Sequence, residues 1–266
     1  MPGVATTLAR VILVLRILLA PLLVAVATLA ARRYGDRIGG WLSAFPFVAG
    51  PLLLVLALER GTDFAAAASR NAILGIASLA FFVLAYVHLA RRLPWWGALL
   101  PAWGVYVLAS WFLMGLTSSL GLRLGLAFLG LAIAWLLLPE GRTGTTGQGL
   151  PPGLDLVARM VAAGGLVTLL SWTAGFLGAG WTGILTPFPV ATTVLVTFAH
   201  AQGCAAAVSR LLKGYLPALG ALAVFFAVLA EALVPQGVVR AFGLGLLAVS
   251  LWQTALLPSL LKARRD

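Results

Sequence analysis

Apolar runs of roughly 20 residues recur from one end of this chain to the other, and that is the length an α-helix needs to cross the core of a bilayer. A soluble domain has about 25% charged residues, whereas only 9% of these 266 residues are charged and 62% are hydrophobic. A transmembrane barrel would show alternating segments of about 10 residues instead. The sequence therefore predicts an all-α, polytopic membrane protein without a sizeable soluble domain.

The apolar runs predict about nine membrane spans, separated by short loops. Their approximate ranges are 7–30, 39–61, 62–90, 95–116, 120–138, 155–176, 180–203, 205–233 and 238–261. One longer polar segment, 140–154, is rich in Gly, Thr and Pro, which is typical of a linker. We therefore predict a first unit at 1–139, with four spans plus a linking fifth span, and a second unit of four spans at 155–266.

The chain has a net charge of +11, but its basic residues lie between the apolar runs. They are expected to set topology and to contact anionic lipid headgroups, not nucleic acid. Across nine spans, twelve of the 18 lysines and arginines fall on one side and six on the other. The positive-inside rule then places the C-terminus in the cytoplasm and the N-terminus outside. Arginine outnumbers lysine, and Ala, Gly and Leu are abundant, which is typical of a GC-rich bacterial genome. We therefore expect a protein of the bacterial inner membrane.

Two parts of the chain share one order of features, which predicts an internal duplication. A tryptophan is followed by Phe-Pro, an apolar run, a glycine and an Ala-rich segment that ends in Ser-Arg. The two copies are Trp41, Phe45-Pro46, Gly61, Ser69-Arg70 and Trp181, Phe188-Pro189, Gly203, Ser209-Arg210. Because the copies begin at spans one and six, an odd offset, the second copy would be inverted relative to the first. Inverted repeats are a transporter architecture with a central substrate site.

The two Phe-Pro pairs, Phe45-Pro46 and Phe188-Pro189, predict two broken helices. Proline removes a backbone donor and displaces the carbonyl four residues before it. In lipid such a carbonyl must find a partner or line a wet cavity. The pairs are therefore candidate substrate-binding segments, although a kink that only fits helices together would have the same sequence.

Arg70 and Arg210 are the candidate anion-binding residues, because a central arginine is costly in a membrane and often marks a substrate path. Each lies part of the way into its helix, and small residues before it favour close helix packing. Ser69, Ser209 and Asn71 are their candidate polar neighbours. The alternative is that both arginines reach the headgroup region.

Four further residues are candidates for proton coupling, because a proton-coupled carrier needs titratable groups. They are Glu59, His88, His200 and Glu231. Each could equally be an interfacial residue in contact with water. The sequence shows no nucleotide loop, Ser/His/Asp set or metal-ligand pattern, so we expect no cofactor, no metal and no enzymatic activity.

From Tyr34-Gly35-Asp36-Arg37 through Phe45-Pro46 to Gly61, the chain resembles the GlpM/YdgC-type family of small bacterial inner-membrane proteins. In that family a Tyr, Gly-Leu and Phe-Pro stretch precedes an apolar run and a glycine. The likeness covers about one repeat at a time, so this chain would be a fused double version. The resemblance implies an inner-membrane location and a small helical unit, and it assigns no substrate or site residue.

Two functions fit these patterns. The first is a secondary transporter or flippase, with membrane lipids as partners, for a small organic anion or a lipid-linked phosphate bound between the repeats. The second is a scaffold or assembly subunit of an envelope complex, whose arginines contact only lipid headgroups. Substrate, coupling ion, direction of transport and homo-oligomer formation are left open by the sequence.

Overall fold

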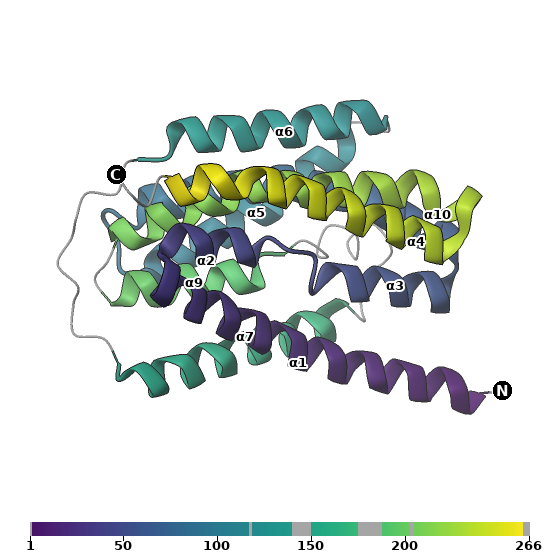
Figure 1. The fold of residues 1–266 in the computed structure, drawn as a ribbon, viewed down its shortest axis with the longest axis horizontal. Helices are drawn as coiled ribbons and strands as arrows, with labels where there is room; N and C mark the ends of the chain where they lie inside the picture. Colours follow the sequence, from purple (N-terminus) through teal and green to yellow (C-terminus); the bar gives the residue numbers. More distant parts are fainter. Residues whose placement is uncertain (1, 117–118, 140–149, 175–187, 203–204, 263–266) are drawn as a thin grey trace.

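The structure is a computed structural model that describes residues 2–116, 119–139, 150–174, 188–202 and 205–262. The regular elements within these ranges are all α-helices (Figure 1), which confirms the predicted all-α class. The helices are α1 (Pro2–Tyr34), α2 (Asp36–Ser43), α3 (Ala49–Arg60), α4 (Thr62–Leu89), α5 (Trp95–Leu116), α6 (Leu120–Leu137), α7 (Pro152–Ala174), α9 (Val190–Ala201) and α10 (Ala205–Lys262).

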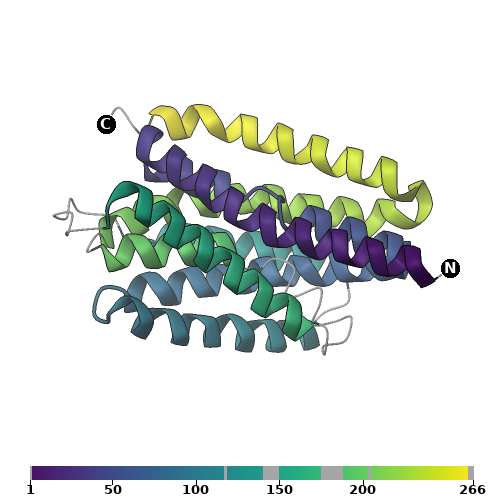
Figure 2. The ribbon, with the colours of Figure 1, turned by 90° about the horizontal axis from the view of Figure 1, so that it is seen from below.

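Five helices of the described chain are long and apolar enough to cross a membrane, which fits the predicted membrane class. They are Thr62–Leu89, Trp95–Gly115, Leu120–Leu137, Pro152–Leu169 and Ala206–Leu260. The last of them contains two of the predicted spans, because Gly237 breaks it at a φ of 77°. After Gly237 the chain turns back along the first part of α10 (Figure 2). The count of five therefore establishes a membrane-type helical fold without establishing nine spans.

The first Phe-Pro pair interrupts a helix, as predicted. α2 ends at Ser43 and α3 begins at Ala49, so Phe45-Pro46 lies in the non-helical connection. Proline cannot donate to the helical ladder, which explains the break at this point. After the second pair, α9 begins at Val190 directly behind Pro189. The residues before it, 175–187, lie outside the described residues.

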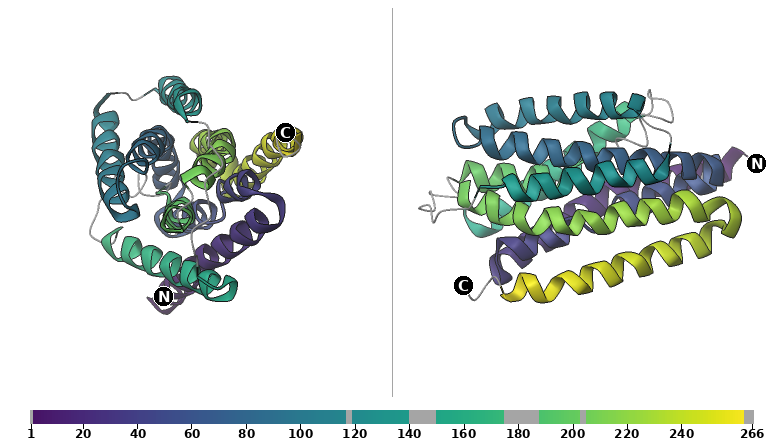
Figure 3. Two further views of the ribbon diagram at one scale, coloured as in Figure 1. Left: turned by 90° about the vertical axis from the view of Figure 1, so that its left-hand side faces the viewer. Right: turned by 90° about the horizontal axis from the view of Figure 1, so that it is seen from above.

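Helix α4 and the first part of α10 form the centre of the bundle. Phe82 of α4 and Phe225 and Phe226 of α10 are fully buried on the faces by which the two helices pack. α4 also packs against α5 and α6, while α10 also packs against α2, and α1 packs against α7. Seen end-on, the other helices surround this centre (Figure 3).

α2 and α10 cross at very short range because two glycines face the opposite backbone. A Cβ atom on Gly40 would collide with the carbonyl oxygen of Leu211, and one on Gly214 would collide with the carbonyl oxygen of Arg37. Any larger residue would push the helices apart. This crossing fixes the beginning of α2 beside the beginning of α10.

The bundle has two ends, which we name after one residue of each. At the Asp155 end, α1 and α9 terminate while α2, α7 and α10 begin, and contacts between their residues hold them together. At the Gly237 end lie the N-terminus, Gly61 and the turn of α10 (Figure 1). The candidate site lies at the Asp155 end.

Candidate anion site at the Asp155 end

A cavity of about 500 Å³ lies where α1, α2, α7, α9 and α10 meet at the Asp155 end. Its lining holds an unusual number of polar groups for an apolar chain, among them three arginines. The polar lining residues are Thr28, Arg32, Asp36, Asp155, Arg159, Gln202 and Arg210. Leu150, Leu195 and Leu211 are among the apolar ones. The cavity therefore concentrates cationic donors inside a membrane-type bundle.

Asp155 is the hub of this cluster. It lies in the first turn of α7, and its carboxylate is buried, with 4% of the side chain exposed. Arg159, one turn later on the same helix, donates from Nε at 2.9 Å, and Arg32 of α1 donates from Nη2 at 2.6 Å to Oδ2. Gln202, at the end of α9, donates to Oδ1 at 2.6 Å. One carboxylate thus joins three helix ends.

Arg159 is held on a second side by an aromatic ring. Its guanidinium carbon lies 4.9 Å from the centroid of the Phe198 ring, which favours a cation–π contact. Only 9% of the Arg159 side chain is exposed, against 36% for Arg32. Arg159 is therefore largely committed to protein contacts, whereas Arg32 keeps part of its surface free for a ligand.

Arg210 forms the second ion pair of the cavity. Its Nε donates to Oδ2 of Asp36 at 2.8 Å, and 38% of its side chain is exposed. The glycine crossing of α2 and α10 brings these two residues together, because Gly40 and Gly214 each lie one turn after a member of the pair. Asp36 also lies in the first turn of α2, where the helix dipole favours a carboxylate.

The cavity lining has an excess of positive charge and a hydroxyl group without a hydrogen-bond partner among the described residues. The three arginines carry one positive charge more than the two aspartates can neutralise. The hydroxyl of Thr28 is buried, with 3% of the residue exposed, and has no hydrogen-bond partner among the described residues. Leaving such a group unsatisfied costs about 1–3 kcal/mol. An anion in the cavity would supply both the missing charge and the missing acceptor.

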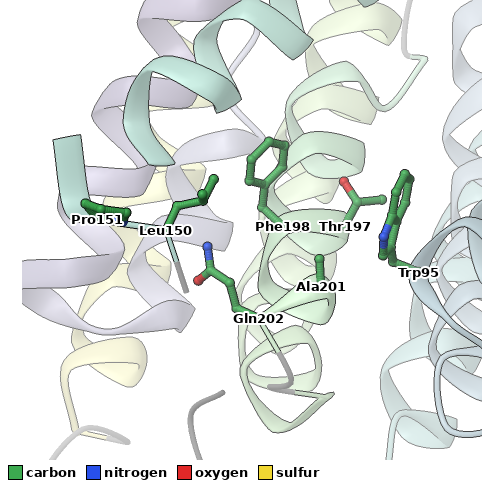
Figure 4. A pocket seen from close by; sticks show the side chains of 7 residues that line it. All are labelled: Trp95, Leu150, Pro151, Thr197, Phe198, Ala201 and Gln202. Atoms are coloured by element: carbon green, nitrogen blue, oxygen red, sulfur yellow. The ribbon is translucent and has the colours of Figure 1, made fainter. Parts of the chain in front are cut away.

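A second, apolar pocket of about 460 Å³ adjoins the cavity (Figure 4). It is lined by Trp95, Leu150, Pro151, Thr197, Phe198, Ala201 and Gln202. Figure 4 shows Trp95 on one side, Leu150 and Pro151 on the other, and the α9 residues between them. Leu150 and Gln202 line both spaces. The polar cavity and the apolar pocket are thus neighbours that share part of their walls.

The structure places the two predicted anion-binding arginines at different ends of the bundle. Arg210 lines the cavity, whereas Arg70 donates to Glu231 at 3.2 Å and to the carbonyl of Ala230 at 3.3 Å. Arg210 and Glu231 are 21 residues apart on one helix, about 30 Å at 1.5 Å per residue. The expected joint site of Arg70 and Arg210 does not form, because each arginine pairs with a carboxylate near its own end.

The two Phe-Pro pairs do meet. Phe45, Phe188 and Pro189 line one small inner pocket of about 50 Å³, together with Thr192 and Tyr215. The Phe188 ring lies edge-on to Tyr106, with centroids 5.3 Å apart, and Pro46 is buried. The broken segments therefore face each other inside the bundle, although they lie outside the arginine cavity.

The other predicted site residues lie outside the cavity lining. Glu59 and His88 are exposed, and Glu231 pairs with Arg70. His200 is partly buried, with Nδ1 3.3 Å from the Tyr86 hydroxyl. Ser69 and Ser209 are buried, and Asn71 accepts from Arg123 at 2.7 Å. Their roles in substrate binding or proton coupling stay predictions.

The prediction from sequence did not include Asp155, Arg159, Arg32, Asp36 and Thr28 among the site residues. A usable signal was present, because Asp155 and Arg159 are four residues apart in an apolar helical run, the spacing of an ion pair on one helix face. The described residues contain no group of three or more His, Cys, Asp or Glu side chains that could hold a metal ion.

No protein-family model matches the chain, and comparisons with curated proteins and with solved structures find no similar protein. The resemblance of residues 34–61 to the GlpM/YdgC-type family therefore stays an expectation. Function has to be argued from the geometry of the site.

Proposed function

We propose that this protein is a bacterial inner-membrane transporter or flippase whose anionic substrate binds in the cavity at the Asp155 end. The observation that carries the proposal is the cavity lining, which holds three arginines, two aspartates and Thr28, whose buried hydroxyl has no hydrogen-bond partner among the described residues. Guanidinium groups bind carboxylates and phosphates through paired hydrogen bonds. A scaffold whose arginines only contact lipid headgroups would have no need of such a cavity.

The exposed fractions of the three arginine side chains indicate different roles for them. Arg159 is tied to Asp155 and Phe198, so it holds the site together and contributes mainly its charge. Arg210 pairs with Asp36, and Arg32 donates from Nη2 to Asp155 and to the Pro152 carbonyl, yet each keeps more than a third of its side chain exposed. The substrate anion binds to these free donors, and Asp155 and Asp36 hold them in place before it arrives.

The proposal includes nine spans arranged as an inverted repeat. In that arrangement α1 corresponds to α7, the α2–α3 pair to the segment that ends in α9, and α4 to the first part of α10. The packing of α1 on α7 and of α4 on α10 supports it, because equivalent elements of two related units meet at the axis between them. The meeting of the two Phe-Pro segments in one small pocket supports it as well.

The proposed orientation places the Asp155 end in the cytoplasm and the N-terminus outside. Basic residues at this end support it through the positive-inside rule, among them Arg33 in the last turn of α1 and Arg91 and Arg92 after α4. The cavity then receives substrate from the cytoplasmic side. The small pocket of about 50 Å³ at the Phe-Pro segments shares no lining residue with the cavity, so transport past these segments requires one repeat to move against the other.

Flux of a small anion through proteoliposomes tests this function. The probe is radiolabelled methyl phosphate, and the variants are Arg32→Gln, Arg210→Gln and, as the matched control, Arg70→Gln. We expect tenfold or greater losses of flux in the first two, because a hydrogen bond to a charged group contributes about 1.5–3 kcal/mol. The control should keep the wild-type rate.

Two results would overturn the proposal. Equal losses in Arg70→Gln and Arg210→Gln would show that the cavity is not the site. Absence of protein-dependent flux, combined with absence of methyl phosphate binding to the purified protein, would favour the scaffold function instead.

A further inference from the structure

We propose that the substrate is an amphiphile, with an oxyanion head of about one negative charge bound among the arginines and an aliphatic chain lying in the Trp95–Phe198 pocket. This inference rests on the proposed anion site and names its substrate class. It follows from two adjoining spaces of similar size and opposite character, about 500 Å³ and about 460 Å³.

The two spaces are joined by residues that serve both. Gln202 lines both, and its amide donates to Asp155 in the polar cavity. Phe198 lines the apolar pocket while its ring lies against the Arg159 guanidinium. A bound molecule that follows these residues passes from cationic donors to an apolar wall, which is the layout of a lipid head and its first carbons.

The charge of the cavity limits the head. Three arginines against two aspartates leave one positive charge for the ligand to neutralise. A phosphodiester or a carboxylate carries one negative charge, and both fit paired hydrogen bonds from guanidinium groups. The buried Thr28 hydroxyl adds a donor that has no acceptor among the described residues.

The position of the apolar pocket favours a ligand that comes from the bilayer. Trp95 lies at the beginning of α5, beside Trp96 and just after Arg91 and Arg92, and both tryptophans are exposed. Tryptophan and basic residues mark the level of the lipid headgroups. Both spaces therefore lie near the headgroup level, where a lipid of the same leaflet enters with its head and its first chain carbons.

A chain-length series tests the inference on protein in phosphatidylcholine nanodiscs. The probes are methyl, butyl, hexyl and octyl phosphate at pH 5, where each carries about one negative charge because the second pKa of a phosphate monoester is about 6. Octyl glucoside is the probe that has the chain without the charge. Binding is measured by displacement of radiolabelled octyl phosphate and corrected with empty nanodiscs. We expect affinity to rise by up to about fourfold per added methylene, and octyl glucoside to displace at least tenfold more weakly than octyl phosphate.

Ala201→Phe separates the pocket from the rest of the site. Ala201 lines the apolar pocket without lining the polar cavity, so a benzyl group there should occupy the chain space. In this variant the affinity should no longer rise with chain length, so octyl phosphate should bind about as weakly as methyl phosphate. Val161→Phe is the matched control, because Val161 is 69% exposed on α7 and lines neither space; it should leave the series unchanged.

The outcomes distinguish this inference from the function on which it rests. If methyl phosphate binds as tightly as octyl phosphate, or if Ala201→Phe keeps the full chain-length dependence, the amphiphile is wrong and the anion site stands. If octyl glucoside binds as tightly as octyl phosphate, and Arg210→Gln changes neither, both proposals are wrong.

Discussion

Arg70 and Arg210 follow the same Ala-rich segment and the same serine, yet their surroundings differ. Arg210 lines a cavity with two other arginines and pairs with Asp36. Arg70 pairs with Glu231 at the other end of the bundle, where 47% of its side chain and 59% of its partner's are exposed. Two similar Ala-rich Ser-Arg segments therefore lie in different chemical surroundings.

The residue one turn after each arginine explains part of the difference. Gly214 follows Arg210 and lets α2 approach α10 until their backbones touch. Leu74 follows Arg70 and is fully buried in the core. The glycine allows α2 to approach so closely that Asp36 reaches Arg210, whereas the Leu74 side chain packs into the core. Close backbone approach, and not the arginine alone, makes the Asp155 end a site.

The largest effect is expected from Asp155→Asn, which keeps the shape and removes the charge. Arg159 is 7% exposed and would lose its carboxylate partner. Removing one member of a buried ion pair costs about 3–5 kcal/mol. The free energy of unfolding in mixed micelles should fall by that amount. Adding Arg159→Gln should recover part of the loss. If the single variant Asp155→Asn stays within about 1 kcal/mol of wild type, the Asp155 carboxylate does not hold these helix ends together.

A smaller loss, about 1–3 kcal/mol, is expected from Gly40→Ala, because an added methyl group overpacks a tight contact. Its Cβ would strike the Leu211 carbonyl and push α2 away from α10. The variant should also weaken methyl phosphate binding, since Asp36 and Arg210 would separate. Gly104→Ala is the control: nothing lies within 4 Å of its Cβ, so stability should stay equal or rise. Equal behaviour of the two variants would show that the crossing is not tight.

These contrasts show which features a sequence can reveal. The helical membrane class and the break at Phe45-Pro46 follow from apolar run length and from the missing proline donor, both of which are local. The pairing of Arg210 with Asp36 joins residues 174 positions apart, and it depends on which helices cross. No local pattern carries that information, so the sequence could not show that Arg70 and Arg210 pair with carboxylates at opposite ends of the bundle.

Asp155 and Thr28 are site residues that the sequence did not predict. The Asp155–Arg159 spacing predicts an ion pair, but Arg32 and Gln202 reach the same carboxylate from two other helices. Thr28 is one of many hydroxyl residues in apolar runs, and only the packing shows it to be buried without a partner. The site became visible once α1, α7, α9 and α10 were placed together.

Thr28→Val should change stability and binding in opposite directions. Removing an unsatisfied buried hydroxyl should leave the ligand-free protein equally stable or about 1 kcal/mol more stable. Binding of methyl phosphate should weaken about fivefold, because the ligand loses one donor. Thr168→Val is the control, since the Thr168 hydroxyl already donates to Gly164 on its own helix. Unchanged binding in Thr28→Val would remove this hydroxyl from the site.

The smallest effect is expected from Glu231→Gln, which tests the other half of the comparison. An ion pair that faces water contributes about 0–1 kcal/mol, and the side chains of Arg70 and Glu231 are 47% and 59% free of protein contacts. Stability and methyl phosphate flux should therefore stay close to wild type. A loss as large as that of Asp155→Asn, or a tenfold loss of flux, would give the Gly237 end a site of its own. Arg70 would then act in the substrate path as the sequence first predicted, and the two Ser-Arg copies would be equivalent in function as well as in position.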